Sequence, residues 1–132
     1  MKKVLFLSLI LALSTSLFAQ EAKKVEFSEE THDFGTVQQG TDNGRIKTVF
    51  TFKNISTSPI VLQNATASCG CTTPNVEKNK VILPGEYGEI PVAYDSNREG
   101  SFNKTVTVTF GIGTETFQER LYIKGVVVKP AQ

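Results

Sequence analysis

The sequence contains few side chains of the kinds that most often bind metals or catalyse reactions. It has no Trp, one His (His32), two Cys (Cys69 and Cys71) and one Met, which is Met1. A closed four-ligand zinc site would therefore need carboxylates or a second chain. A Ser-His-Asp triad would have to use His32, and a lone His beside Asp33 is more often a hydrogen-bonded structural residue. No motif of a serine hydrolase, zinc protease or phosphate-binding loop occurs, so we expect a protein that is not an enzyme.

Leu and Ala are scarce beyond the N-terminal segment. Residues 20–132 hold 3 Leu and 5 Ala against 14 Thr and 12 Val. Leu and Ala favour helices, whereas β-branched side chains suit a pleated sheet. The composition excludes an all-α fold and predicts an all-β fold, and a length of 132 residues allows one domain.

The sequence has 14 Lys and Arg residues and 13 Asp and Glu residues, so neither sign of charge dominates. Nucleic-acid binding usually needs a basic patch or stripe, and the sequence has no basic stripe with interleaved aromatic residues. We therefore expect no nucleic-acid partner.

The only long apolar run is at the N-terminus. Two lysines precede the mostly apolar residues 4–13, and the small residues Ser16 and Ala19 offer cleavage sites. A basic start, a short apolar run and a small residue at the cut are typical of a secretory signal peptide. The run is shorter than the roughly 20 apolar residues that span a bilayer. We predict a signal peptide over residues 1–19, no membrane span, and a bacterial periplasmic or secreted protein.

The remaining residues, 20–132, alternate between apolar and polar in short runs separated by turn residues. This alternation is typical of half-buried strands. It predicts strands over residues 46–53, 59–65, 90–94, 102–110 and 117–128, with weaker ones over 25–27, 33–37 and 80–83. The expected fold is one immunoglobulin-like sandwich of about seven or eight strands.

The segment Ser68-Cys69-Gly70-Cys71-Thr72 carries the only unusual chemistry in the sequence. In an extended backbone, residues two apart point the same way, so both sulfurs would face one spot. One interpretation is a disulfide or redox pair, worth only about 1.6 kcal/mol because it closes three residues. Extended residues two apart also lie near or beyond the usual limit of Cα separation in a disulfide.

Two other interpretations of Cys69 and Cys71 stay open. The pair could bind Cu(I), or Zn(II) with additional ligands, because thiolates are soft ligands. The thiols could also be small apolar groups packed against one end of the sandwich.

The order of several motifs resembles a bacterial family, domain of unknown function 1573. The matching segments are His32-Asp33-Phe34-Gly35-x-Val37-x-x-Gly40, Phe52-x-Asn54, Ser68-Cys69-Gly70-Cys71-Thr72-x-Pro74, Pro84-Gly85-Glu86-x-Gly88-x-Ile90-x-Val92-x-Tyr94-Asp95, Gly100-x-Phe102-x-Lys104 and Leu121-x-Ile123-x-Gly125-Val126. The resemblance implies an exported immunoglobulin-like sandwich, distantly similar to abnormal-spindle/hydin and major-sperm-protein modules, which act mainly as scaffolds and protein-binding domains. It implies no catalytic residues.

Two hypotheses about function follow. The first is an exported, non-enzymatic module that binds an unidentified envelope or extracellular protein and carries no cofactor. The second is a periplasmic thiol protein that uses Cys69 and Cys71, either to carry Cu or Zn or to take part in dithiol redox chemistry.

Overall fold

The structure, a computed structural model, describes residues 22–131, so the predicted signal peptide over residues 1–19 lies outside the described residues. The elements, in chain order, are β1 (Val25–Phe27), β2 (Thr31–Gln38), α1 (Thr41–Gly44), β3 (Arg45–Asn54), β4 (Ile60–Ala67), β5 (Thr72–Pro74), β6 (Lys80–Ile82), β7 (Tyr87–Asp95), β8 (Gly100–Ile112) and β9 (Glu115–Val128). Within residues 22–131, no helix is both long and apolar enough to cross a bilayer.

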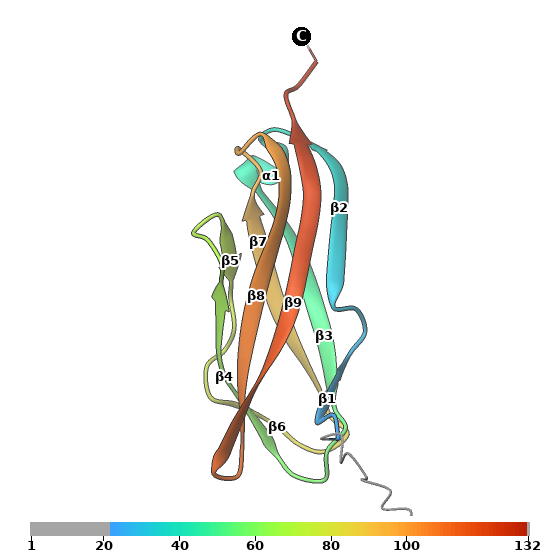
Figure 1. The fold of residues 1–132 in the computed structure, drawn as a ribbon, viewed down its shortest axis with the longest axis vertical. Coiled ribbons are helices and arrows are strands. Elements are labelled where there is room, and N and C mark those ends of the chain that lie inside the picture. Colours follow the sequence, from blue (N-terminus) through green and yellow to red (C-terminus); the bar gives the residue numbers. More distant parts are fainter. Residues whose placement is uncertain (1–21, 132) are drawn as a thin grey trace, which may run out of the picture.

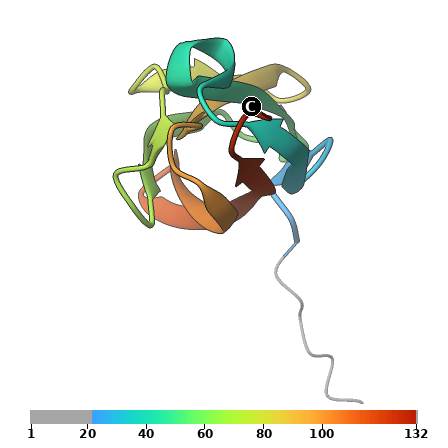
Figure 2. The same ribbon diagram turned by 90° about the horizontal axis from the view of Figure 1, so that it is seen from above.

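The strands form two sheets that pack face to face (Figures 1 and 2). The four-stranded sheet has the order β1-β3-β7-β5, and the five-stranded sheet has the order β2-β9-β8-β4-β6. Neighbouring strands run antiparallel except β2 and β9, which run parallel. The predicted all-β, immunoglobulin-like sandwich is confirmed, with nine strands in the described residues where about seven or eight were expected.

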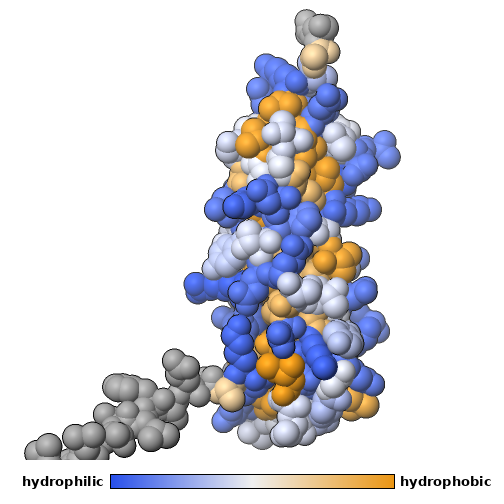
Figure 3. All heavy atoms as spheres, turned by 90° about the vertical axis from the view of Figure 1, so that its right-hand side faces the viewer, coloured by the Kyte–Doolittle hydropathy of each residue, from blue (hydrophilic) through white to orange (hydrophobic). Residues whose placement is uncertain are grey.

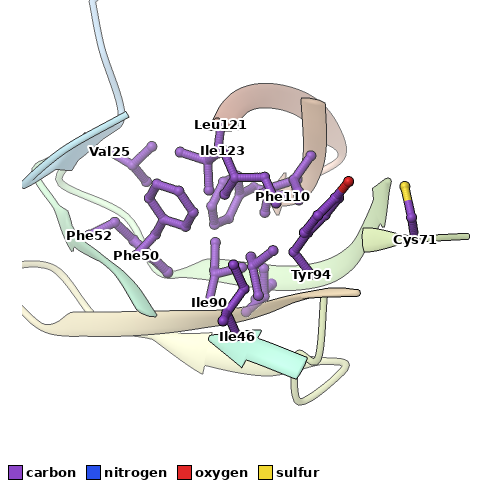
Figure 4. Close-up of a cluster of buried hydrophobic side chains, with 14 of the residues drawn as sticks. Val25, Ile46, Phe50, Phe52, Cys71, Ile90, Tyr94, Phe110, Leu121 and Ile123 are labelled. Atoms are coloured by element: carbon purple, nitrogen blue, oxygen red, sulfur yellow. The ribbon is translucent and has the colours of Figure 1, made fainter. Parts of the chain in front are cut away.

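The core lies between the sheets because each long strand turns alternate residues inward. In β3, Phe50 and Phe52 are buried and Lys47 is exposed, as the period-two pattern predicts. The ring of Phe52 meets the edge of Phe110 from the opposite sheet, with centroids 5.1 Å apart. The buried apolar residues are Val25, Ile46, Phe50, Phe52, Ile60, Leu62, Cys71, Ile82, Ile90, Val92, Tyr94, Phe102, Val106, Val108, Phe110, Leu121, Ile123 and Val127 (Figure 4).

The end of β8 and the turn α1 differ from the sequence predictions. The strand predicted over residues 102–110 is longer in the structure, where β8 continues to Ile112 and the turn is formed by Gly113 and Thr114. Gly113 has φ +58°, a conformation that glycine adopts without steric cost. The single turn α1 was not expected, and its residues Asp42 and Asn43 have positive φ, as short polar side chains tolerate.

Pro91 lies within β7, between two other strands, although proline cannot donate a ladder hydrogen bond. Its carbonyl accepts a hydrogen bond from the backbone N–H of Asn75, just beyond the end of β5. The nitrogen of Pro91 faces the same side, where β5 has already ended at Pro74. The proline therefore cannot return a hydrogen bond to the Asn75 carbonyl, and it marks the point where pairing on that side stops.

Glu119 of β9 is partly buried and shares the strand face of the buried Leu121 and Ile123. Burial raises the pKa of the Glu119 carboxyl above its ordinary value, while the positive charge of Lys23 opposes that rise. A raised pKa means that the folded state binds the proton more tightly than the unfolded state does. Stability from this group is therefore present at low pH and decreases as pH rises from the ordinary pKa through the raised one.

We expect Glu119→Gln to unfold at a slightly higher urea concentration than the wild type at pH 7, because the amide carries no charge to desolvate. The difference should shrink at pH 4, where the wild-type carboxyl is largely protonated. The control is Glu115→Gln at the exposed start of the same strand. A Glu119→Gln protein less stable than the wild type at pH 7 would contradict this account.

Candidate functional site

The cysteine turn, residues 68–71, connects β4 of one sheet to β5 of the other. The structure places the sulfurs of Cys69 and Cys71 at disulfide-bonding distance, with their Cα atoms 5.3 Å apart. That separation is within the usual disulfide range. The expectation of an extended backbone here is wrong, because the chain turns and the Thr72 N–H donates a hydrogen bond to the Cys69 carbonyl at 3.3 Å. The turn shortens the Cα separation and brings the sulfurs together.

The two cysteines differ in burial. Cys71 is only 3% exposed and lies at one end of the core, beyond Tyr94 (Figure 4), whereas Cys69 is partly buried. The Cys71 carbonyl accepts a hydrogen bond of 2.8 Å from the Asp95 N–H, which fixes this residue to β7. The buried Thr72 hydroxyl is 3.9 Å from each sulfur. Cys71 is therefore buried with its backbone fixed to β7, Cys69 is the more accessible cysteine, and the Thr72 hydroxyl lies near both sulfurs.

A polar hollow of about 360 Å³ adjoins the cysteine turn, where α1 and the loop after β7 meet it. It is lined by Asn43, Arg45, Gly70, Cys71, Asp95 and Asn97, among others. The buried Ser96 holds α1 in place, because its hydroxyl donates to the Thr41 carbonyl at 2.8 Å and its N–H donates to the Gly44 carbonyl at 3.0 Å. Three segments far apart in the sequence thus form one end of the molecule.

The structure brings no other metal-ligating group to the cysteine pair within residues 22–131, where no group of three or more His, Cys, Asp or Glu side chains gathers. His32 lies on β2, and its Nδ1 is 2.9 Å from a carboxylate oxygen of Glu29. The neighbouring Asp33 instead accepts a hydrogen bond from the Gly35 N–H. His32 is thus hydrogen-bonded, as expected, and binding of Cu or Zn at Cys69 and Cys71 stays a prediction.

We expect the double variant Cys69→Ala with Cys71→Ala to fold and to lose only about 1–2 kcal/mol of unfolding free energy. A cross-link that closes three residues restricts the unfolded chain little, and Ala at position 71 leaves only a small void at the end of the core. Urea unfolding of oxidised wild type and of the variant measures the difference. A loss above about 4 kcal/mol would show instead that the pair is a main structural support.

A second candidate surface lies on the outer face of the four-stranded sheet. Val49 of β3 pairs with Pro91 of β7, and Lys47 pairs with Ala93. With Arg45 and Pro74, these residues line a shallow groove of about 480 Å³, which we call the Val49 strip. Val49 is 47% exposed, so the apolar floor is open to solvent. The strip combines an apolar floor with two cationic side chains, Arg45 and Lys47.

Sequence reasoning missed the Val49 strip, although a signal was present. In a half-buried strand the outward positions are expected to be polar. Val49, Pro91 and Ala93 are apolar residues at outward positions of β3 and β7, and the strand register places them together. The side of the molecule on which β2 lies shows a different pattern, with small apolar patches separated by hydrophilic side chains (Figure 3).

Comparison with known proteins supports the fold and the motif resemblance. A family model described as "Protein of unknown function (DUF1573)" matches residues 25–127. No curated protein matches the chain.

Many solved structures share the fold, and three of them represent its range. The ASH/PapD-like domain 7 of human CEP192 has a TM-score of 0.66 at 10% identity, covering 82% of this chain and 87% of that one. WR4, a C. elegans MSP family member, has a TM-score of 0.56 at 7% identity, and the match covers 81% of this chain and 100% of WR4. The Vibrio cholerae VesB protease has a TM-score of 0.65 at 14% identity and covers 79% of this chain, which spans 32% of the length of VesB. The expected likeness to abnormal-spindle/hydin and major-sperm-protein modules is therefore confirmed at the level of fold.

Proposed function

Since the chain belongs to the family described as "Protein of unknown function (DUF1573)", its function has to be argued from its surfaces, and we propose that it is an exported, non-enzymatic module that binds a protein partner through the Val49 strip. The observation that carries this proposal is an apolar groove on a sheet face that would otherwise be polar. Export rests on the signal-peptide pattern of residues 1–19.

The shape and chemistry of the Val49 strip support protein binding. Exposed apolar side chains that gather in one place mark interaction surfaces more often than scattered ones do. The floor of Val49, Pro91 and Ala93 comes from two paired strands, so it is held rigid by the sheet and needs little ordering on binding.

The charges at the strip indicate the chemistry of the partner. Arg45 is held in place because its guanidinium donates a hydrogen bond of 2.9 Å to the Thr73 hydroxyl, and Lys47 is exposed. Charge complementarity favours partners whose carboxylates lie beside an apolar side chain. We therefore expect an acidic segment of the partner, with an apolar residue seated over Val49.

The test is quantitative capture of partners from an envelope extract of the native host by the immobilised mature domain. We expect Val49→Glu and Lys47→Glu each to reduce capture of the principal partner at least tenfold, because each places a negative charge where an acidic segment would bind. The matched control is Tyr122→Glu, at an exposed position on β9 of the other sheet. Circular dichroism confirms that all variants fold. Equal capture by wild type and the two strip variants would overturn the proposal.

A further inference from the structure

We propose that Cys69 and Cys71 form a thiol–disulfide exchange site that accepts electrons from a peptide or protein dithiol, and that Cys69 is the sulfur that is attacked. This activity does not depend on partner binding at the Val49 strip, although Arg45 lines both the strip and the hollow beside the turn. Three features of the cysteine turn support it, namely the unequal access to the sulfurs, the position of Thr72 and the polar hollow alongside.

Access decides which sulfur an incoming thiolate attacks. Cys71 is 3% exposed and is tied to β7 through the hydrogen bond from Asp95 to its carbonyl, whereas Cys69 is only partly buried. Gly70, between them, is exposed, and a Cβ atom added there would meet nothing within 4 Å. A thiolate can therefore approach the turn over Gly70 and reach Cys69, whereas Cys71, although it lines the hollow, has almost no exposed surface.

Thr72 is placed to assist the sulfur that leaves. Its hydroxyl is 3.9 Å from each sulfur and is buried. A hydroxyl that donates to a thiolate stabilises the charged form and makes that sulfur a better leaving group. When the bond breaks, the hydroxyl can shift toward Cys71 without any change in the backbone, because Cys71 and Thr72 are adjacent.

The exchange balances in two steps. A thiolate of the dithiol forms a bond to Cys69 Sγ, the Cys69–Cys71 bond breaks, and the electron pair passes to Cys71 Sγ, which then takes up a proton. The second thiolate of the dithiol then attacks the first sulfur of the same dithiol, which is bonded to Cys69 in the mixed disulfide. This attack releases Cys69 as a thiolate, which takes up a proton. The dithiol is oxidised to a disulfide and the Cys69–Cys71 pair is reduced to two thiols.

The hollow beside the turn indicates the substrate class. Its lining includes the amides of Asn43 and Asn97 and the charges of Arg45 and Asp95. Side chains of these types can hydrogen-bond both the N–H and the C=O groups of an extended peptide. The surroundings therefore fit a dithiol carried on a polar peptide segment better than an apolar thiol.

The test begins with the mature protein purified without reductant, whose intact mass should be two hydrogens below that of the reduced form. Glutathione, a monothiol, is then added, the reaction is quenched with acid, and the mixed disulfide is mapped by peptide mass spectrometry. We expect at least tenfold more adduct at Cys69 than at Cys71. Free thiols in the starting protein, or equal adducts at both positions, would overturn the proposal.

Rates of reduction test Thr72 and the hollow. With dithiothreitol as the dithiol, we expect Thr72→Val to slow reduction about tenfold, while Thr66→Val, at an exposed position of β4 outside the hollow, leaves the rate within twofold. Urea unfolding of the oxidised proteins separates a chemical effect from a loss of structure. A polar peptide with two cysteines should react at least tenfold faster with the protein than with an isolated Ser-Cys-Gly-Cys-Thr peptide in its oxidised form. Equal rates for Thr72→Val and wild type, or for protein and isolated peptide, would contradict the inference.

Discussion

Replacement of Phe52 by Ala is expected to lower the free energy of unfolding by about 3–5 kcal/mol, the loss typical of a fully buried aromatic ring. Phe52 is 1% exposed and contacts both sheets. Its ring centroid is 5.5 Å from that of Phe27 and 5.1 Å from that of Phe110. Truncation would remove these contacts and leave a cavity between the layers that the rigid strands cannot close. Urea unfolding followed by circular dichroism measures the loss.

Gly88 provides an internal check on the Phe52 prediction. A Cβ atom at Gly88 would overlap the far end of the Phe52 ring, so Gly88→Ala alone should destabilise the protein by about 1–3 kcal/mol. In a Phe52→Leu background the overlap is relieved, and Gly88→Ala should then lower the free energy of unfolding by clearly less. Val81→Ala, at a half-exposed edge position, is the control and should change stability by less than about 0.5 kcal/mol. Strictly additive effects of Phe52→Leu and Gly88→Ala would contradict this packing.

Replacement of Asn54 by Ala is expected to lower the free energy of unfolding by about 2–3 kcal/mol, because it leaves buried polar groups without partners. Asn54 is fully buried, and its amide donates to the Ser58 carbonyl at 2.9 Å and to the Ile82 carbonyl at 2.8 Å. Its Oδ1 accepts from the Ser56 N–H at 3.0 Å and from the Ser56 hydroxyl at 2.7 Å. One side chain thus joins the β3–β4 loop to the end of β6.

The matched control for Asn54 is Ser56→Ala, which removes the hydrogen bonds of the Ser56 hydroxyl to Asn54 and Ser58 and leaves the Asn54 amide bonded to both carbonyls. We expect Ser56→Ala to lower the free energy of unfolding by about 1 kcal/mol. Thermal and urea unfolding of both variants provide the comparison. If Asn54→Ala were no more destabilising than Ser56→Ala, the bonds to the Ser58 and Ile82 carbonyls would contribute little, contrary to the expectation.

The fold was largely predictable from sequence where strands are long and one face is buried. In β8, residues Val106, Val108 and Phe110 are buried and Thr107 and Thr109 lie outward, as the alternation indicates. The three-residue strand β5 was missed, because Thr72–Pro74 is too short to show a period and contains a proline. Its strand character comes from pairing with β7, a contact between residues about 20 positions apart.

The candidate sites were predictable only in part, for a related reason. The spacing of Cys69 and Cys71 identified the pair, but the turn that sets their separation depends on hydrogen bonds within residues 68–72 and to β7. Neither the burial of Cys71 nor the approach of Thr72 to both sulfurs can be derived from composition. The Val49 strip needs the register of β3 against β7, which places Val49 opposite Pro91. Register is a property of the paired sheet and is invisible in either strand alone.

Site-specific photo-cross-linking in the native host would decide whether the Val49 strip binds a protein partner. A photoreactive amino acid replaces Val49 in one strain and Thr107, on the outer face of the five-stranded sheet, in another. We predict one discrete cross-linked species from position 49, lost when Lys47→Glu is added, and none of comparable yield from position 107. Equal cross-linking from both positions, or none from position 49, would contradict partner binding at the strip.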